Sequence, residues 1–137
     1  MTRGLTLGAQ GLVVDPDNRV LLVRHTYRPG WQFPGGGGEK GEDVMMALRR
    51  ELHEEVGVIV EGEPELFALY ANSRHFPNDH IAFFIVRSWR LPVIPEPNRE
   101  IAEQAFFPAD QLPQDAHPTT VARIGEVFRG RPRDPIW

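Results

Sequence analysis

The chain has 137 residues, of which 41% are hydrophobic and 25% are charged, and its net charge is −4 at pH 7. This length predicts one domain with its own core, over residues 1–137. The acidic balance argues against binding of a nucleic-acid polymer, which usually requires a strongly basic patch. The absence of cysteine excludes disulfides and thiolate metal sites.

The sequence also shows no recognisable targeting signal. The N-terminal stretch lacks the apolar run of a signal peptide, and no stretch is long and apolar enough to span a membrane. We therefore expect a cytoplasmic protein with no membrane partner. Small phosphorylated ligands are compatible with the acidic balance, because a bound divalent cation can supply positive charge.

The first elements expected in chain order are two strands, over residues 5–15 and 19–25, which are apolar and rich in β-branched residues. Turn-forming residues 15–18 separate them, so we expect the two strands to pair with each other. Residues 30–43 are rich in glycine and proline, which predicts a loop.

A helix is predicted over residues 42–56, because apolar side chains recur there at helical spacing. Gly57 follows at the position where a glycine commonly ends a helix. The second half of the chain predicts strands over 65–74 and 80–91, a proline-rich loop over 92–100, a strand over 101–108 and a helix over 117–130. Strands that alternate irregularly with two helices favour a mixed sheet covered by helices over an all-parallel sheet.

Three glutamates gather on one side of the first predicted helix. On a helical wheel, at about 100° per residue, Glu51, Glu54 and Glu55 border the buried stripe and do not face open solvent. They are neighbours, because steps of three and four residues return to the same helix face. Arg50 lies four residues before Glu54, on the flank of this acidic cluster.

Two interpretations of the cluster stand side by side. Repelling carboxylates beside a core are costly unless a positive charge compensates them, and a hard cation such as Mg²⁺ or Mn²⁺ prefers such oxygen ligands. The alternative is a solvated acidic helix face with Arg–Glu pairs four residues apart. On geometry alone the two interpretations are equal.

The four glycines from Gly35 to Gly38 precede this helix. Glycine allows unusual backbone angles and the close approach of another group, and a glycine-rich loop can present N–H groups to an anion. Beside a carboxylate cluster, such a loop suggests a metal that bridges protein carboxylates and substrate phosphates.

The spacing from Gly36 to Val58 resembles the Nudix box. That 23-residue pattern reads G, five residues, E, seven residues, R-E, an aliphatic residue, any residue, E-E, any residue, G and an aliphatic residue. The chain matches it without a gap at Gly36, Glu42, Arg50, Glu51, Leu52, Glu54, Glu55, Gly57 and Val58. From average residue usage, such a match arises by chance on the order of once per billion start positions.

The resemblance to the Nudix family extends to the strand and loop before the box and to residues 100–113 after it. It implies an α/β fold, an α/β/α sandwich with a central mixed β-sheet, which agrees with the elements expected above. Members of the family hydrolyse a nucleoside diphosphate linked to another moiety. A metal-activated water attacks phosphorus, and Mg²⁺ or Mn²⁺ neutralises the charge of the leaving diphosphate.

The resemblance therefore implies a Mg²⁺-dependent diphosphohydrolase with a small nucleotide substrate. Nucleoside triphosphates, dinucleoside polyphosphates and nucleotide sugars all stay open as substrates, and a homodimer is an expectation from the family alone. The alternative is a non-catalytic Nudix-like module that binds a nucleotide and regulates a partner. Loss of box carboxylates would mark such a module, and all of them are present here.

The resemblance also implies roles for the box residues. The metal ligands are Glu51, Glu54 and Glu55, and either Glu54 or Glu51 serves as the general base. Arg50 resembles the arginine that orients the glutamates. The residues that brace the loop and shape the backbone are Glu42, Gly36, Gly37 and Gly57.

Candidates outside the box are less specific. Glu100 and Glu103 precede Phe106 and Phe107, so either resembles a further metal ligand or base, and either is equally an ordinary loop charge. The loop before the box carries cationic and aromatic residues that can hold phosphate or stack on a base, namely Arg24, His25, Tyr27 and Arg28. Among these we select Arg24 and Tyr27, together with Arg74 near the turn at 75–79, as substrate-binding candidates. Solvated loop residues are the alternative for each.

Overall fold

Four strands form a mixed sheet in the computed structural model of the chain, which describes residues 4–137, so the first three residues of the predicted domain lie outside it. In spatial order they are β4 (Gly35–Gly37), β1 (Thr6–Val13), β7 (Asp79–Val86) and β6 (Glu65–Ala71). β1 runs parallel to β7, and the other neighbours are antiparallel.

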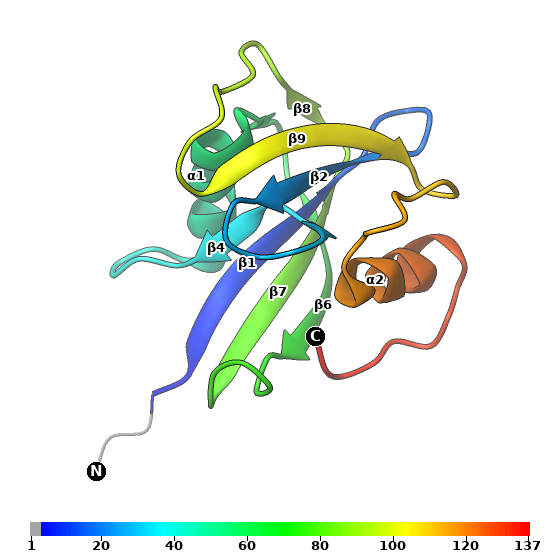
Figure 1. The fold of residues 1–137 in the computed structure, drawn as a ribbon. Helices are drawn as coiled ribbons and strands as arrows, with labels where there is room; N and C mark the ends of the chain where they lie inside the picture. The colour runs from blue at the N-terminus through cyan, green and yellow to red at the C-terminus, as the bar shows by residue number, and fades with distance from the viewer. Residues whose placement is uncertain (1–3) are drawn as a thin grey trace.

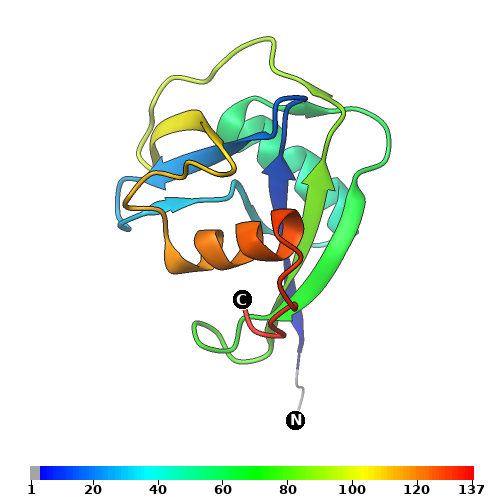
Figure 2. The same ribbon diagram turned by 90° about the vertical axis from the view of Figure 1, so that its right-hand side faces the viewer.

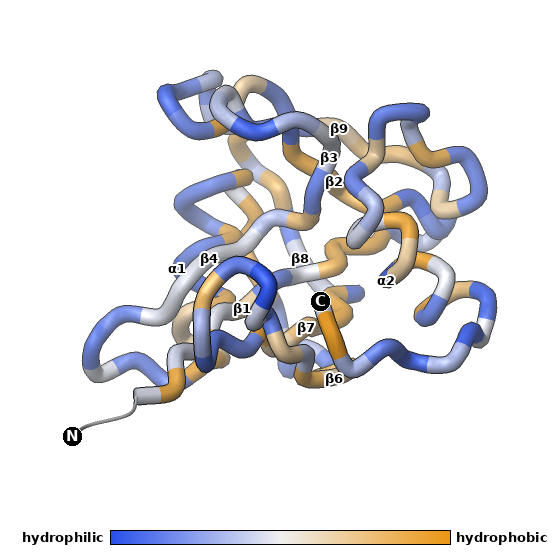
Figure 3. The backbone as a smooth tube through the Cα atoms, turned by 60° about the horizontal axis from the view of Figure 1, so that its bottom comes forward, coloured by the Kyte–Doolittle hydropathy of each residue, from blue (hydrophilic) through white to orange (hydrophobic). Residues whose placement is uncertain are grey.

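Three further strands form an antiparallel sheet beside the first, and two very short strands pair separately. The antiparallel sheet consists of β3 (Trp31–Gln32), β2 (Arg19–His25) and β9 (Ile101–Pro108). The short pair is β5 (Ile59–Val60) with β8 (Trp89–Arg90). The hydrophobic stretches lie mainly in the strands, and the connecting loops are mostly hydrophilic (Figure 3).

Two helices cover opposite faces of the strands, α1 (Val44–Val56) and α2 (Pro118–Phe128) (Figures 1 and 2). Side chains alternate between the two faces, as the strand period requires. Along β1, Ala9 and Val13 pack with Leu48 of α1, whereas Leu12 packs in a second cluster with Ile124 of α2. The predicted α/β/α sandwich around a mixed sheet is therefore confirmed.

The predicted pairing of the first two strands is wrong. β1 pairs with β4 and β7, and β2 pairs with β3 and β9, so that an isolated bridge between Val14 and Val20 is what joins them. The turn itself exists, because Asp15 accepts hydrogen bonds from the backbone N–H groups of Asp17 and Arg19. Both strands are buried on two faces, so packing in the core decides their partners rather than the short turn.

Smaller differences concern element ends. The predicted loop over 30–43 contains β3 and β4, and the predicted strand over 80–91 is interrupted between Val86 and Trp89. α1 begins at Val44, because the Asp43 carboxylate accepts a hydrogen bond from the Met46 N–H at 2.8 Å and caps the helix. Gly57 ends α1 with a φ of 80°, as the pattern predicted.

A buried ion pair fixes the chain that follows α2. Arg123 and Glu126 are 1% and 7% exposed, and their side chains meet at 2.8 Å. Glu126 also accepts hydrogen bonds from the Tyr70 hydroxyl at 2.5 Å and from the Asp134 N–H at 3.0 Å, while Arg123 donates to the Ile136 carbonyl at 3.2 Å. The pair thus joins α2, β6 and the C-terminal segment. Within residues 4–137, no helix is long and apolar enough to cross a membrane.

We expect Glu126→Ala to lower the free energy of unfolding by about 3–5 kcal/mol, because it leaves the Arg123 charge buried without a partner. Urea denaturation followed by circular dichroism measures the loss. The control is Glu61→Ala, which breaks the exposed pair with Arg90 (3.3 Å) and should cost less than about 1 kcal/mol. Similar losses in the two variants would contradict the assigned role of the buried pair.

Candidate active site

Arg50 is the centre of a network that joins α1 to the glycine loop. Its guanidinium forms a bidentate pair with Glu42, with distances of 2.7 and 2.9 Å, and donates to Glu51 at 3.0 Å and Glu54 at 3.3 Å. It also donates to the Gly37 carbonyl at 3.1 Å. The hydrogen bonds that Arg50 donates to Glu42 raise the pKa of Arg50 above its usual value, so the guanidinium keeps its charge.

Glu42 lies in the loop just before α1 rather than on the helix. Besides pairing with Arg50, its carboxylate accepts a hydrogen bond from the Glu39 N–H at 2.7 Å. These hydrogen bonds lower the pKa of Glu42, the larger effect coming from Arg50. Glu42 therefore ties the loop to the helix side chain that contacts Glu51 and Glu54, an arrangement that fits a bracing role.

The glycines of β4 allow the backbone to lie against the glutamates. A Cβ added to Gly36 would stand 2.7 Å from the Glu51 carboxyl carbon, which is closer than real side chains approach. Gly35 has a φ of 147°, and a Cβ there would stand 2.2 Å from the Ala9 carbonyl oxygen. The Gly35 N–H donates to Glu55 at 3.2 Å. Glycine is required at both positions because β1, β4 and α1 converge here.

Several carboxyl groups gather where these elements meet, and the pKa values of Glu51 and Glu55 are raised. Burial raises the pKa of Glu55 to about 8, and the charges of Glu51 and Glu100 add to the effect. Burial also raises the pKa of Glu51, where Arg50 opposes the shift and the charges of Glu54 and Glu100 reinforce it. The carboxylates are therefore electrostatic neighbours, and Arg50 compensates only part of their charge.

The chemistry of this donor set fits a hard divalent cation, which takes several carboxylate oxygens and offsets their repulsion. Within residues 4–137, no three carboxylate or imidazole side chains are arranged to hold a metal ion as they stand. Arg50 instead donates a hydrogen bond to one oxygen of Glu51 and one of Glu54, at 3.0 and 3.3 Å.

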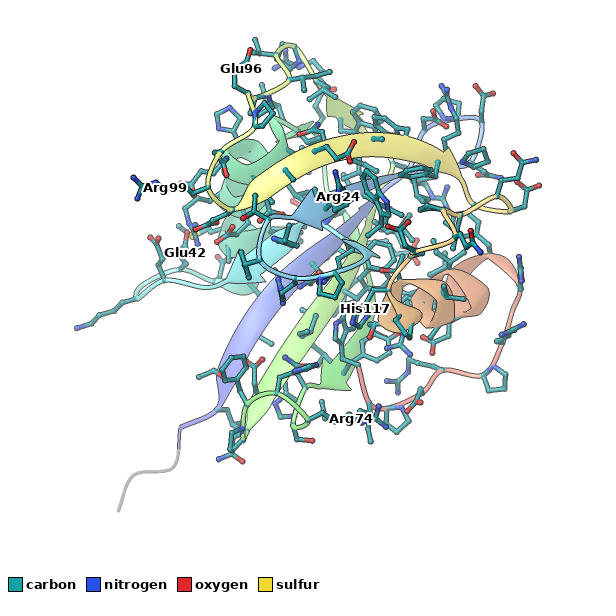
Figure 4. All side chains as sticks on the ribbon, viewed as in Figure 1. Arg24, Glu42, Arg74, Glu96, Arg99 and His117 are labelled. Atoms are coloured by element: carbon teal, nitrogen blue, oxygen red, sulfur yellow. The ribbon has the colours of Figure 1, made fainter. Side chains whose placement is uncertain are left out.

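The other predicted site residues are distributed unevenly. Glu100 lies close enough to raise the pKa of Glu51 and of Glu55, whereas Glu103 forms an ion pair with Arg24 across β2 and β9, with Nε 2.7 Å from the carboxylate. Arg24 and Glu103 thus neutralise each other. Figure 4 shows Arg74 at the turn between β6 and β7, well away from Glu42, which follows β4 at the opposite edge of the sheet.

The helical wheel predicts the burial of two of the three helix glutamates correctly. The Glu51 side chain is 20% exposed and Glu55 is partly buried, but the Glu54 side chain is 61% exposed. The expectation that all three avoid open solvent is therefore wrong for Glu54. Its position at the outer edge of the cluster follows from the helical angle, which places it farthest from the buried stripe.

A cavity of about 570 Å³ lies between the loop after β2, the turn between β6 and β7 and the start of α2. Aromatic side chains line it, including the predicted Tyr27, and so do the amide side chains of Gln10 and Gln32. His117 lies at its edge, where burial lowers the pKa of the imidazole and the charges of His75 and Arg28 add to the effect.

None of the box glutamates lines the cavity, but the paired strands β1 and β4 link the two places. Gln10 pairs with Gly35 in the sheet, and Gly35 donates to Glu55. Arg28 lines the cavity, and its charge lowers the pKa of Glu55, so it influences both places. Sequence reasoning favoured Arg24 over Arg28 and passed over Gln10. The available signal was a polar glutamine within the apolar first strand.

Comparison with known proteins gives a consistent result. A sequence model of the NUDIX domain matches residues 4–128. An 8-oxo-dGTP diphosphatase of Proteus vulgaris is 34% identical over 88 residues, which cover 60% of this chain and 76% of that protein. An RNA pyrophosphohydrolase of Caulobacter vibrioides is 56% identical over 46 residues, which cover 31% of this chain and 27% of that protein. The chain spans less than half of the length of such RNA pyrophosphohydrolases.

Solved structures share the fold. A MutT NUDIX hydrolase from Burkholderia pseudomallei has a TM-score of 0.77 and 23% identity, over 92% of this chain and all of that one. An ADP-ribose pyrophosphatase from Streptococcus suis has a TM-score of 0.68 and 24% identity, over 96% and 97% of the two chains. At these identities the likeness shows the fold alone. From the match over residues 4–128, the chain belongs to the NUDIX domain family, and the Nudix-type diphosphohydrolase expected from the box is confirmed as the reaction class.

Proposed function

We propose that the chain hydrolyses the diphosphate linkage of a small nucleotide at the carboxylate cluster of α1, with Mg²⁺ or Mn²⁺ as cofactor. One observation carries the proposal, namely the convergence of Glu51, Glu54 and Glu55 on Arg50 and on the glycine backbone of β4. A fold gains nothing from such crowding unless a cation offsets it. Nudix proteins typically use divalent metal ions, which agrees with this donor set.

Glu51, Glu54 and Glu55 are the proposed metal ligands, with Glu100 as a further candidate. A bound divalent cation supplies charge neutralisation at the diphosphate and lowers the pKa of water. Arg50 orients Glu51 and Glu54, and its bidentate pair with Glu42 keeps the guanidinium in place while those carboxylates change partners. The glycines of β4 leave space for the Glu51 carboxylate.

We assign the general base to Glu54 in preference to Glu51. Glu51 lies against Gly36 and Arg50, which suits a fixed ligand. Glu54 is 61% exposed and has one contact of 3.3 Å to Arg50, so its carboxylate is free to accept a proton from water. In this assignment Glu54 takes the proton of the attacking water while Arg50 limits its orientation.

A small nucleotide fits the chain better than an RNA polymer. The net charge of −4 opposes binding of a long phosphate backbone, although RNA pyrophosphohydrolases are among the relatives. The cavity of about 570 Å³ is large enough for a nucleoside and lies within reach of Arg28.

We expect turnover from a panel of nucleoside triphosphates, oxidised deoxynucleotides, nucleotide sugars and dinucleoside polyphosphates, with Mg²⁺ and not with chelator. Released phosphate and diphosphate, together with chromatography of the nucleotide product, identify the bond that is cleaved. Undiminished nucleotide binding without turnover of any compound would favour the regulatory module and reject the enzyme.

We expect Glu54→Gln to lower kcat by about 10²–10⁴-fold, because it removes a positioned proton acceptor. The melting temperature should stay unchanged, since the side chain is exposed. The matched control is His53→Gln, at an exposed position on the same helix, with near-normal kcat expected. Near-normal kcat in Glu54→Gln would remove Glu54 from this role.

We expect Gly36→Ala to weaken Mg²⁺ binding and to lower kcat/KM by at least about tenfold, because the new Cβ would displace the Glu51 carboxylate, and each tenfold loss is about 1.4 kcal/mol. Gly37→Ala is the control, since a Cβ there meets open space. Calorimetric Mg²⁺ titration and initial rates compare the two. Equal behaviour of the variants contradicts the proposed contact between Gly36 and a metal ligand.

A further inference from the structure

The segment after α2 returns to the sheet and ends at the cavity. The Ala71 N–H donates to the Pro135 carbonyl at 2.9 Å, and the Trp137 N–H donates to the Ala71 carbonyl at 2.9 Å. Arg133 adds a hydrogen bond to the Leu69 carbonyl at 2.9 Å. Figure 2 shows this segment leaving α2 and running toward the lower end of the sheet. The last residues are therefore placed by hydrogen bonds to the edge of β6.

The buried pair of Arg123 and Glu126 fixes the same segment from the other side. Glu126 accepts from the Asp134 N–H, and Arg123 donates to the Ile136 carbonyl. A buried ion pair is often no more stabilising than apolar residues of similar size, because desolvation of both charges is costly. The contribution of this pair is structural specificity, since its hydrogen bonds hold the segment in one position.

The result of this anchoring is the placement of Trp137. Its ring stands 5.3 Å from Tyr70 and 5.4 Å from Phe83, both edge to face, and the Arg123 guanidinium lies 5.4 Å from its centroid. Trp137 is still partly exposed, and its exposed part lines the cavity of about 570 Å³. Phe33 lies beside it, with ring centroids 6.3 Å apart.

The rest of the cavity suits a flat ring with polar edges. The partly buried amides of Gln10 and Gln32 offer both donors and acceptors in the same wall as Phe33. Arg28 lines the same cavity, and Gln10 in its wall pairs with Gly35, whose N–H donates to Glu55. A ligand that spans both places therefore carries an aromatic heterocycle at one end and an anionic diphosphate at the other.

We propose that Trp137 is a specificity-determining residue that packs against the base of the nucleotide whose diphosphate lies at the carboxylate cluster. Arg123 and Glu126 are positioning residues, because they act through the segment that carries Trp137. This inference rests on the proposed function, since it deepens the same site. It assigns to the end of the chain a role in substrate choice that lies outside the Nudix box.

The test compares Trp137→Ala with wild type on two substrates, a nucleoside triphosphate that wild type cleaves and ribose 5-triphosphate, which lacks the base. Loss of one stacked base contact corresponds to about tenfold or more in kcat/KM. We expect that loss for the nucleoside triphosphate, carried mainly by KM, and less than a twofold change for ribose 5-triphosphate. Equal losses on both substrates, or none on either, would overturn the proposal.

A second variant and a second measurement keep the test decisive. Should Trp137→Ala fail to fold, Trp137→Phe retains a smaller ring, and the same selective loss is expected at reduced size. Should wild type cleave nothing, the proposed function fails, and calorimetry of nucleoside diphosphate and ribose 5-diphosphate tests the base contact without turnover. Selective weakening of nucleoside diphosphate binding in the variant supports the inference, and unchanged or equally weakened binding of the two ligands rejects it.

Discussion

The bidentate contact between Arg50 and Glu42 is the interaction on which the arrangement of the site depends. It joins the first turns of α1 to the loop that precedes it, and the same guanidinium reaches Glu51 and Glu54. Without a cation at this place, four glutamates near one helix face would repel one another and the loop. Arg50 therefore offsets part of this repulsion within the protein itself.

The glycines of β4 restrict the same glutamates from the side of the sheet. Gly36 lies so close to Glu51 that a methyl group has no space, and the Gly35 N–H reaches Glu55. Because β4 pairs with β1, the same backbone contact fixes Gln10 at the wall of the cavity. The reacting end and the recognition end of the proposed substrate site are thus two sides of one pair of strands.

Features that depend on interactions within one element could be predicted from the sequence. The helix over residues 42–56, its glycine end and the grouping of its glutamates follow from spacing along one element, and the Nudix box gave the family. Strand partners did not follow, because β1 and β7 are separated by more than 60 residues and pair through core packing. The ion pair of Arg24 was not predictable for the same reason, since the register of β2 with β9 places Glu103 opposite Arg24.

Two arginine–glutamate networks in this chain differ mainly in burial, and burial separates their roles. Arg123 and Glu126 are almost fully buried. Breaking their pair would leave an uncompensated buried charge, so the pair holds its geometry fixed. Arg50 is 20% exposed and shares its hydrogen bonds among several carboxylates, so one contact can be exchanged at low cost. The proposed metal site needs the second kind of network. The segment after α2, which holds Trp137 in place, needs the buried kind.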